Sequence, residues 1–150
     1  EDLKTAGYQI AIATGRPRTE TIVPFETIHI KELFDDEHIV TASEVLIAED
    51  LYPELKPLGK PNPFSYLATL EGNDQSKYQH YASNQENRVN KEDVYIVGDS
   101  LADLLSAKKI GATFIGPLTG LKGQNAREEL EAYEADYIIN HVGEVRNILL

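Results

Sequence analysis

The chain has 150 residues, with 25 Asp and Glu against 14 Lys and Arg, so its formal net charge at pH 7 is −11. We expect one domain over residues 1–150, because this length can bury a core, and the acidic charge without a basic cluster argues against nucleic acid as a partner. No apolar stretch reaches the roughly 20 residues of a bilayer span, and cysteine is absent, so we expect no membrane partner and a cytoplasmic location.

The first predicted elements alternate between helix and strand. Residues 2–7 have the pattern of a last helical turn ended by Gly7, which predicts further residues upstream of Glu1. Residues 8–13 form an apolar run that predicts a buried strand. The elements expected next are a helix over residues 18–33 with Pro24 as a kink or boundary, a strand over 38–41, a helix that Ser43 caps and Pro53 ends, and a helix over 64–70.

Two polar segments lie in the middle of the chain. Residues 57–63 contain three prolines and predict an ordered loop. Residues 71–93 carry many polar side chains, with Tyr78 and Tyr81 as their main apolar content. We expect this second segment to run over the surface.

The second half of the chain begins with the clearest strand pattern. Residues 94–97 predict a buried strand that leads through Gly98, Asp99 and Ser100 into a helix over 101–110, stopped by Gly111. Leu101, Leu104 and Leu105 would give this helix its apolar face. The remaining predicted elements are strands over 112–115 and 136–139 and helices over 126–133 and 144–150.

Strands that are continuous apolar runs and alternate with helices indicate a parallel sheet covered on both faces. The predicted fold class is therefore α/β, with a doubly wound parallel sheet. Ligands of such sheets bind at the carboxyl ends of the strands, so the residues that follow each strand are the candidates for chemistry.

Polar groups suited to phosphate occur at such positions. Thr14, with Gly15 and Arg16, follows the first strand, Lys60 lies in the proline-rich loop, and Asp99 and Asp103 follow the strand over 94–97. A hydroxyl beside a backbone N–H can hold an anionic oxygen, an ammonium can neutralise it, and carboxylates can hold Mg²⁺.

Each group also has a simpler interpretation. Ser100 to Asp103 has the spacing of a capping box, and Asp99 before a helix can complement the helix dipole. Thr14 can be a turn residue, and a single lysine such as Lys60 is most often a solvated surface charge. The glycine-rich residues 116–123 lack the spacing of a P-loop and predict a loop near the rim of the site. Four histidines show no zinc-binding spacing.

Three segments, in chain order, resemble motifs of the haloacid dehalogenase superfamily. Residues 10–17 are similar to its second motif, 59–63 to its third and 98–103 to its fourth, and 112–115 and 135–139 are similar to its later strands. The resemblance implies that Thr14 binds the transferring phosphoryl group with Gly15, and that Lys60 stabilises the charge on nucleophile and phosphate. It implies that Asp99 is a Mg²⁺ ligand and that Asp103 supports either the metal or Lys60 without binding the metal directly. Arg16 and Ser100 would be supporting residues of the same site.

The sequence departs from this family at the first motif. That motif is an Asp-x-Asp after an apolar strand, which supplies the nucleophile and the general acid/base, and no Asp-x-Asp occurs in residues 1–150. We therefore expect this chain to be the C-terminal part of a longer core domain, without its cap. It would also lack the strand that carries the nucleophile, which in the family's sheet lies between the strands corresponding to residues 8–13 and 94–97. Such a fragment would pair those two strands, oligomerise, or bind the missing N-terminal segment of the same protein.

The resemblance implies a Mg²⁺-dependent phosphatase that acts on a small phosphorylated metabolite through an aspartyl-phosphate. Phosphoglycolate-type phosphatases are the nearest analogy. This chain would supply every catalytic part except the nucleophile and would be inactive alone. A metal-independent dehalogenase is one alternative, and a non-catalytic phosphate-binding or interaction domain is another.

Overall fold

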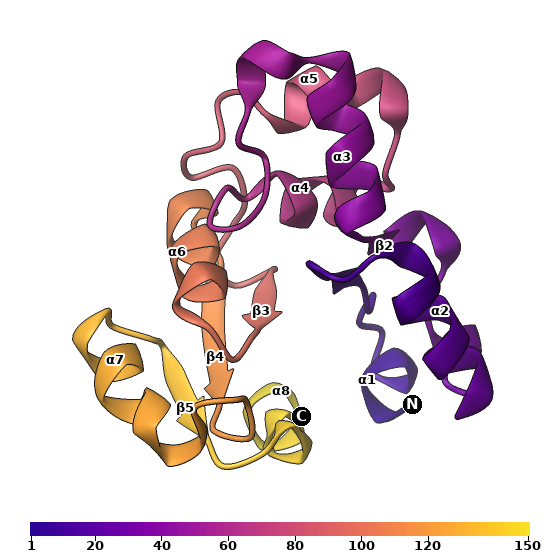
Figure 1. Cartoon of the computed structure of the whole chain (residues 1–150). Helices are drawn as coiled ribbons and strands as arrows, with labels where there is room; N and C mark the ends of the chain where they lie inside the picture. Colours follow the sequence, from indigo (N-terminus) through magenta and orange to yellow (C-terminus); the bar gives the residue numbers. More distant parts are fainter. The chain divides into compact units, whose positions relative to one another are not determined.

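The computed structural model describes residues 1–150, which form two compact units, Glu1–Asn84 and Gln85–Leu150 (Figure 1). Both units combine helices with parallel strands, which confirms the predicted α/β class. The strands form two sheets, of order β1-β2 in the N-terminal unit and β3-β4-β5 in the C-terminal unit. None of the helices combines the length and the apolar character that crossing a membrane would require.

The N-terminal unit is built around two short parallel strands. Ile12 pairs with Ile39 and Ala13 with Val40, and helix α4 packs against both strands. The helices and strands of this unit are α1 Asp2–Thr5, β1 Ile12–Ala13, α2 Arg18–Thr27, β2 Ile39–Val40, α3 Ala42–Leu51, α4 Phe64–Glu71 and α5 Tyr78–Tyr81. Four 3₁₀ turns join them, at Lys31–Leu33, Asp36–His38, Pro53–Leu55 and Gln75–Lys77.

Several predicted boundaries in this unit are wrong. The strand expected over residues 8–13 pairs only at Ile12–Ala13, since its one neighbour, β2, is two residues long. Helix α2 ends at Thr27 instead of continuing to 33, and Pro24 lies inside it without breaking it. Thr41, not Ser43, caps α3, because the Thr41 side chain accepts a hydrogen bond from the Ser43 N–H at 3.2 Å.

The predicted surface excursion contributes two side chains to the core. Tyr78 and Tyr81 are 2% and 0% exposed, and their rings lie edge-on to Phe64 at centroid distances of 5.3 and 6.2 Å. The Tyr78 hydroxyl donates to Asn73 Oδ1 at 2.8 Å, and burial, together with the charge of Glu44, raises the pKa of Tyr78 to about 12. The prediction that residues 71–93 run over the surface is therefore wrong at α5, a short helix whose two tyrosines are buried despite the polar composition of the segment.

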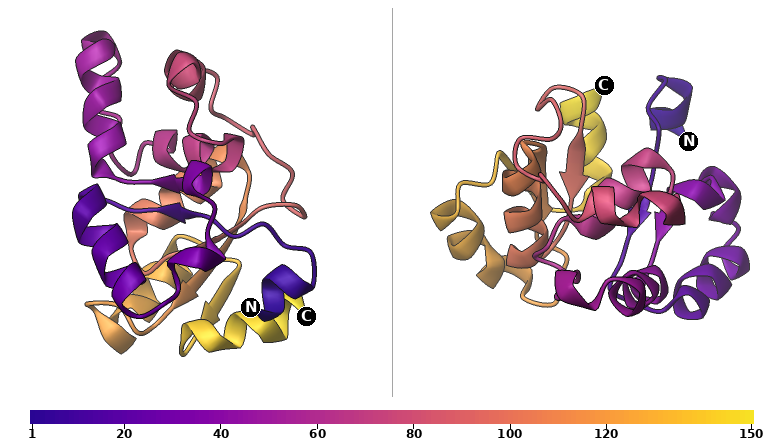
Figure 2. Two further views of the ribbon diagram at one scale, coloured as in Figure 1. Left: turned by 90° about the vertical axis from the view of Figure 1, so that its right-hand side faces the viewer. Right: turned by 90° about the horizontal axis from the view of Figure 1, so that it is seen from above.

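The C-terminal unit is a three-stranded parallel sheet with β4 in the middle, and every residue of β4 is buried. Helices α6 and α7 pack on one side of the sheet, and α8 lies on the other (Figures 1 and 2). The elements of this unit are β3 Tyr95–Val97, α6 Leu101–Ile110, β4 Thr113–Pro117, α7 Ala126–Ala132, β5 Tyr137–Ile139 and α8 Val145–Leu149, with 3₁₀ turns at Gly123–Asn125 and Val142–Glu144.

Two burial predictions in this unit are wrong. Val97 is 40% exposed, because β3 is an edge strand with a partner on one side only. Leu105 is 37% exposed, because it lies on the opposite side of α6 from the buried stripe, which runs through Leu104, Ala107 and Ile110. The predicted stop at Gly111 is confirmed, with a left-handed φ of 86°.

Strands β1 and β3 belong to different sheets, one in each unit. The three outcomes expected for a fragment without its central strand, which are direct pairing of these two strands, oligomerisation and binding of the missing N-terminal segment, all stay predictions.

Asp136 joins two elements of the C-terminal unit and gives its stability a pH dependence. Burial favours the neutral acid, but hydrogen bonds from Lys91 Nζ at 2.6 Å and the Phe114 N–H at 2.8 Å outweigh it, so the pKa of Asp136 lies below its ordinary 3.8. This carboxylate therefore stabilises the fold fully above pH 3.8, and the contribution is lost as the pH falls through the lowered pKa.

We expect Asp136→Asn to reduce the free energy of unfolding at pH 7 by about 1 to 2 kcal/mol, measured by urea denaturation. The difference from the native protein should shrink below pH 3.8. Glu128→Gln, at an exposed position, is the control and should change stability little at either pH. A difference that stays constant down to pH 2.5 would contradict the assignment.

Candidate active site

Thr14 lies directly after β1, at the carboxyl end of the parallel pair. Its N–H donates to the Val40 carbonyl at 3.0 Å, and its Oγ1 accepts a hydrogen bond from the Arg16 N–H at 3.1 Å. The hydroxyl thus closes a tight turn around Gly15, which is exposed and has open space where a Cβ would lie. This is the turn role considered from the sequence, and it also presents backbone and hydroxyl groups at the strand end.

Lys60 reaches the same strand end from the proline-rich loop. Its Nζ donates to the Ala13 carbonyl at 2.9 Å and lies 4.8 Å from the centroid of the Tyr66 ring. Asn62 orders the loop: its side chain donates to the Pro57 carbonyl at 2.9 Å and accepts from the Phe64 N–H at 3.0 Å. The N-terminal unit therefore places the ammonium of Lys60 beside Ala13, the residue that precedes Thr14, although Lys60 and Ala13 are 47 residues apart in sequence.

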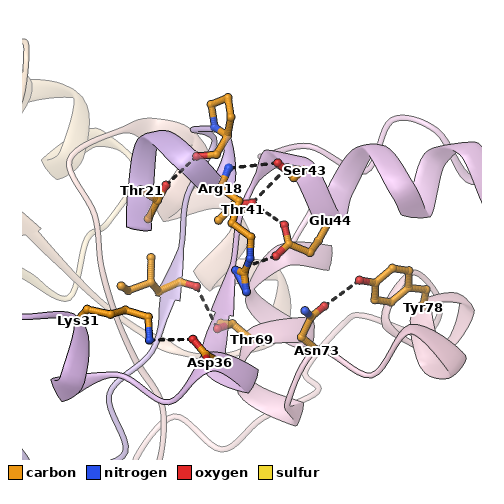
Figure 3. A network of polar contacts seen from close by, with 12 residues as sticks. Arg18, Thr21, Lys31, Asp36, Thr41, Ser43, Glu44, Thr69, Asn73 and Tyr78 are labelled. Carbon is orange, nitrogen blue, oxygen red and sulfur yellow. Dashed lines mark hydrogen bonds and ion pairs between the residues drawn. The ribbon is translucent and has the colours of Figure 1, made fainter. Parts of the chain in front are cut away.

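The turn that carries Thr14 is fastened to the start of α3. The Ala42 N–H donates to the Arg16 carbonyl at 3.0 Å, and the Arg18 N–H donates to Ser43 Oγ at 3.1 Å. The Arg18 guanidinium forms an ion pair of 3.1 Å with Glu44, and Glu44 is only 6% exposed (Figure 3).

Glu44 also accepts a hydrogen bond from the Thr41 hydroxyl, so its carboxylate is shared between the cap of α3 and Arg18. Sequence reasoning missed Thr41 and Glu44. The Thr-x-x-Glu spacing of residues 41–44 is that of a capping box, and this pattern could have identified Thr41 as the cap of α3 and Glu44 as its partner.

A hollow of about 500 Å³ lies on α2 and the turns that follow it. It is lined by both Arg18 and Lys31, but each of these cations already has a carboxylate partner, Glu44 at 3.1 Å and Asp36 at 2.7 Å. Thr14 and Lys60 are not among its lining residues. This hollow is therefore a weaker candidate for a phosphate than the strand end that carries Thr14.

In the C-terminal unit, Asp99 and Asp103 lie at the junction of β3 and α6. Asp99 is exposed, whereas Asp103 is 6% exposed. Asp103 Oδ2 accepts from Ser100 Oγ at 2.8 Å and from the Ser100 N–H at 3.3 Å, while Ser100 Oγ accepts from the Asp103 N–H at 3.3 Å. The capping-box interpretation is thus confirmed, and the role of Asp103 behind a metal stays a prediction.

The donors at this junction suit a hard cation. Mg²⁺ is bound by oxygen, commonly through one or two carboxylates with water and substrate oxygens in the remaining positions, and Asp99 offers an exposed carboxylate. The chain contains no group of three or more His, Asp or Glu side chains placed to hold a metal by themselves. The fit is therefore to a site completed by water, substrate or other oxygen ligands.

Residues 57–145 match a family described as HAD-hydrolase-like, and the matched range includes Lys60, Asp99 and Asp103. The chain belongs to this family. Thr14 and the turn that it closes lie outside the matched range.

Known proteins resemble the chain along its whole length. It is 26% identical over 149 residues both to a phosphoglycolate phosphatase of Vibrio parahaemolyticus and to the pyrophosphatase PpaX of Bacillus mycoides, in each case covering 99% of this chain. It covers 52% and 55% of those proteins, so the chain spans about half the length of the curated relatives it matches. An X-ray structure of a Northeast Structural Genomics Consortium target is 64% identical, with a TM-score of 0.97 over 99% of this chain and 39% of that one.

Proposed function

We propose that this HAD-hydrolase-like chain is part of a Mg²⁺-dependent phosphatase that hydrolyses small phosphate monoesters through an aspartyl-phosphate intermediate. The observation that carries the proposal is the hydrogen bond of 2.9 Å from Lys60 Nζ to the Ala13 carbonyl, which fixes an ammonium at the strand end that bears Thr14. The relatives whose names are phosphatase and pyrophosphatase support the same class of reaction.

In this proposal the N-terminal unit binds the phosphoryl group. The Thr14 hydroxyl and the Gly15 N–H donate hydrogen bonds to its oxygens, and Lys60 offsets the negative charge that develops as the phosphoryl group is transferred. Arg16 adds positive charge next to the turn. The attachment of this turn to α3 keeps the donors in place before substrate arrives.

In the C-terminal unit, Asp99 would hold Mg²⁺, and Asp103 with Ser100 would fix the start of α6 from which Asp99 projects. When bound, the metal neutralises charge on the phosphoryl oxygens. The attacking carboxylate of the Asp-x-Asp motif would come from a segment outside residues 1–150, so we propose that the chain alone does not turn over substrate.

The proposal is tested with the full-length protein and p-nitrophenyl phosphate. We expect hydrolysis to stop when EDTA removes Mg²⁺ and to return when Mg²⁺ is restored, and we expect Asp99→Asn to reduce kcat about 10²-fold or more. Glu92→Gln, exposed and just before β3, should retain activity. Full activity of Asp99→Asn, or turnover that EDTA does not affect, would contradict the metal-dependent mechanism.

The absence of an Asp-x-Asp from residues 1–150 favours a second candidate, a non-catalytic phosphate-binding or interaction domain. In that case the full-length protein would bind inorganic phosphate in calorimetry and would hydrolyse no phosphate monoester. Detectable turnover that depends on Asp99 would exclude this candidate.

A further inference from the structure

The loop after β4 passes directly against Asp99. A Cβ built on Gly120 would lie 2.5 Å from the Cβ of Asp99 and 2.8 Å from its Cγ, and it would also collide with Oδ2. Real Cβ atoms do not approach heavy atoms this closely, so only the missing side chain of Gly120 allows the contact. The two residues are 21 positions apart in sequence, and both belong to the C-terminal unit.

Space, and not backbone conformation, requires glycine at position 120. Gly123 in the same loop has a left-handed φ of 53°, whereas Gly120 does not lie in the left-handed region. A larger residue at 120 would collide with the Cβ of Asp99, and rotation about χ1 does not move that atom. Either the loop or the backbone at the end of β3 would have to shift.

We propose that Gly120 is a positioning residue that holds the Asp99 carboxylate in the orientation in which it binds Mg²⁺. The proposal rests on the proposed function, since it needs Asp99 to be a metal ligand. Asp99 is exposed, so without the loop its side chain would exchange among rotamers. The backbone at Gly120 excludes those rotamers that would point the Asp99 carboxylate toward the loop. Groups that orient a metal ligand from behind contribute strongly to metal affinity.

Asp103 provides an internal comparison, because it too packs on a glycine. A Cβ on Gly98 would lie 2.5 Å from the Cβ of Asp103 and 2.6 Å from its Cγ. Asp103, however, is 6% exposed and held in the capping box, so crowding there disturbs the start of a helix. We expect Gly98→Ala to act mainly on stability and Gly120→Ala mainly on metal binding.

The test measures Mg²⁺ affinity of the full-length protein by isothermal titration calorimetry, without substrate. We expect Gly120→Ala to raise the Mg²⁺ Kd about tenfold or more. Leu121→Ala, at the next and fully exposed position of the same loop, should leave the Kd within twofold. An unchanged Kd for Gly120→Ala, in a protein where Asp99→Asn abolishes Mg²⁺ binding, overturns the positioning role alone. Undiminished Mg²⁺ binding by Asp99→Asn overturns the proposed metal site and the positioning role with it.

A second measurement applies if Gly120→Ala folds poorly. In the native background we expect this substitution to lower the Tm, because the added Cβ meets Asp99. In an Asp99→Gly background the colliding atoms are absent, so the same substitution should lower the Tm much less. Equal losses of Tm in the two backgrounds would show that the contact is not the cause and would overturn the proposal.

Discussion

Under the proposed function, replacement of Lys60 by alanine is expected to lower the kcat of the full-length protein for p-nitrophenyl phosphate by about 10²- to 10³-fold. This is the size of effect seen when one preorganised hydrogen-bond donor is removed from a reacting oxyanion. The Nζ of Lys60 is held by the Ala13 carbonyl at 2.9 Å and by the face of Tyr66 at 4.8 Å, so its charge is in place before substrate binds. Alanine removes the charge, and water in the vacated space would screen the site.

Two further variants make the effect of Lys60 specific. Lys60→Arg keeps the charge but replaces a compact ammonium with a planar fork, which does not reproduce the geometry between Ala13 and Tyr66, so we expect little rescue. Lys56→Ala removes an exposed lysine four positions earlier and should leave kcat unchanged. If Lys60→Ala kept the native kcat in a steady-state assay, the phosphate site would not lie at this strand end.

Phe64→Ala is expected to produce the largest loss of stability, about 3 to 5 kcal/mol in the free energy of unfolding. Phe64 is fully buried and contacts the rings of Tyr78 and Tyr81, so alanine leaves a cavity that aromatic neighbours cannot fill. The backbone N–H of residue 64 donates to Asn62, and alanine keeps this hydrogen bond, so the expected loss comes from the aromatic core.

Urea unfolding followed by circular dichroism measures the loss caused by Phe64→Ala. Leu46→Ala removes a large apolar side chain that is 61% exposed, and it should change the free energy of unfolding by less than about 1 kcal/mol. A loss for Phe64→Ala no larger than that for Leu46→Ala would mean that the aromatic cluster does not form the core of this unit.

Features encoded by neighbouring residues were predictable. Helix α6 has the predicted bounds Leu101–Ile110, because Ser100 begins it and Gly111 ends it, and both signals are local. The positions of Thr14 and Asp99 after strands, and of Lys60 in an ordered loop, follow from the same kind of local pattern.

Features that depend on contacts between distant residues were not predictable. Tyr78 and Tyr81 sit in a polar segment, and only the position of Phe64 against them makes them core residues. The exposure of Val97 depends on how many strands flank β3, which the apolar run itself does not encode. Likewise, the approach of Gly120 to Asp99 arises from the path of the loop after β4.

The capping box at the start of α6 narrows the choice of amino acid at position 103. Asparagine would keep an oxygen for Ser100 but lose the negative charge, while glutamate would keep the charge and extend a longer chain into the space against Gly98. Substitutions accepted over evolutionary time must satisfy the helix start and the close packing together. We therefore expect random variation to be tolerated less at position 103 than at exposed capping residues such as Asp74.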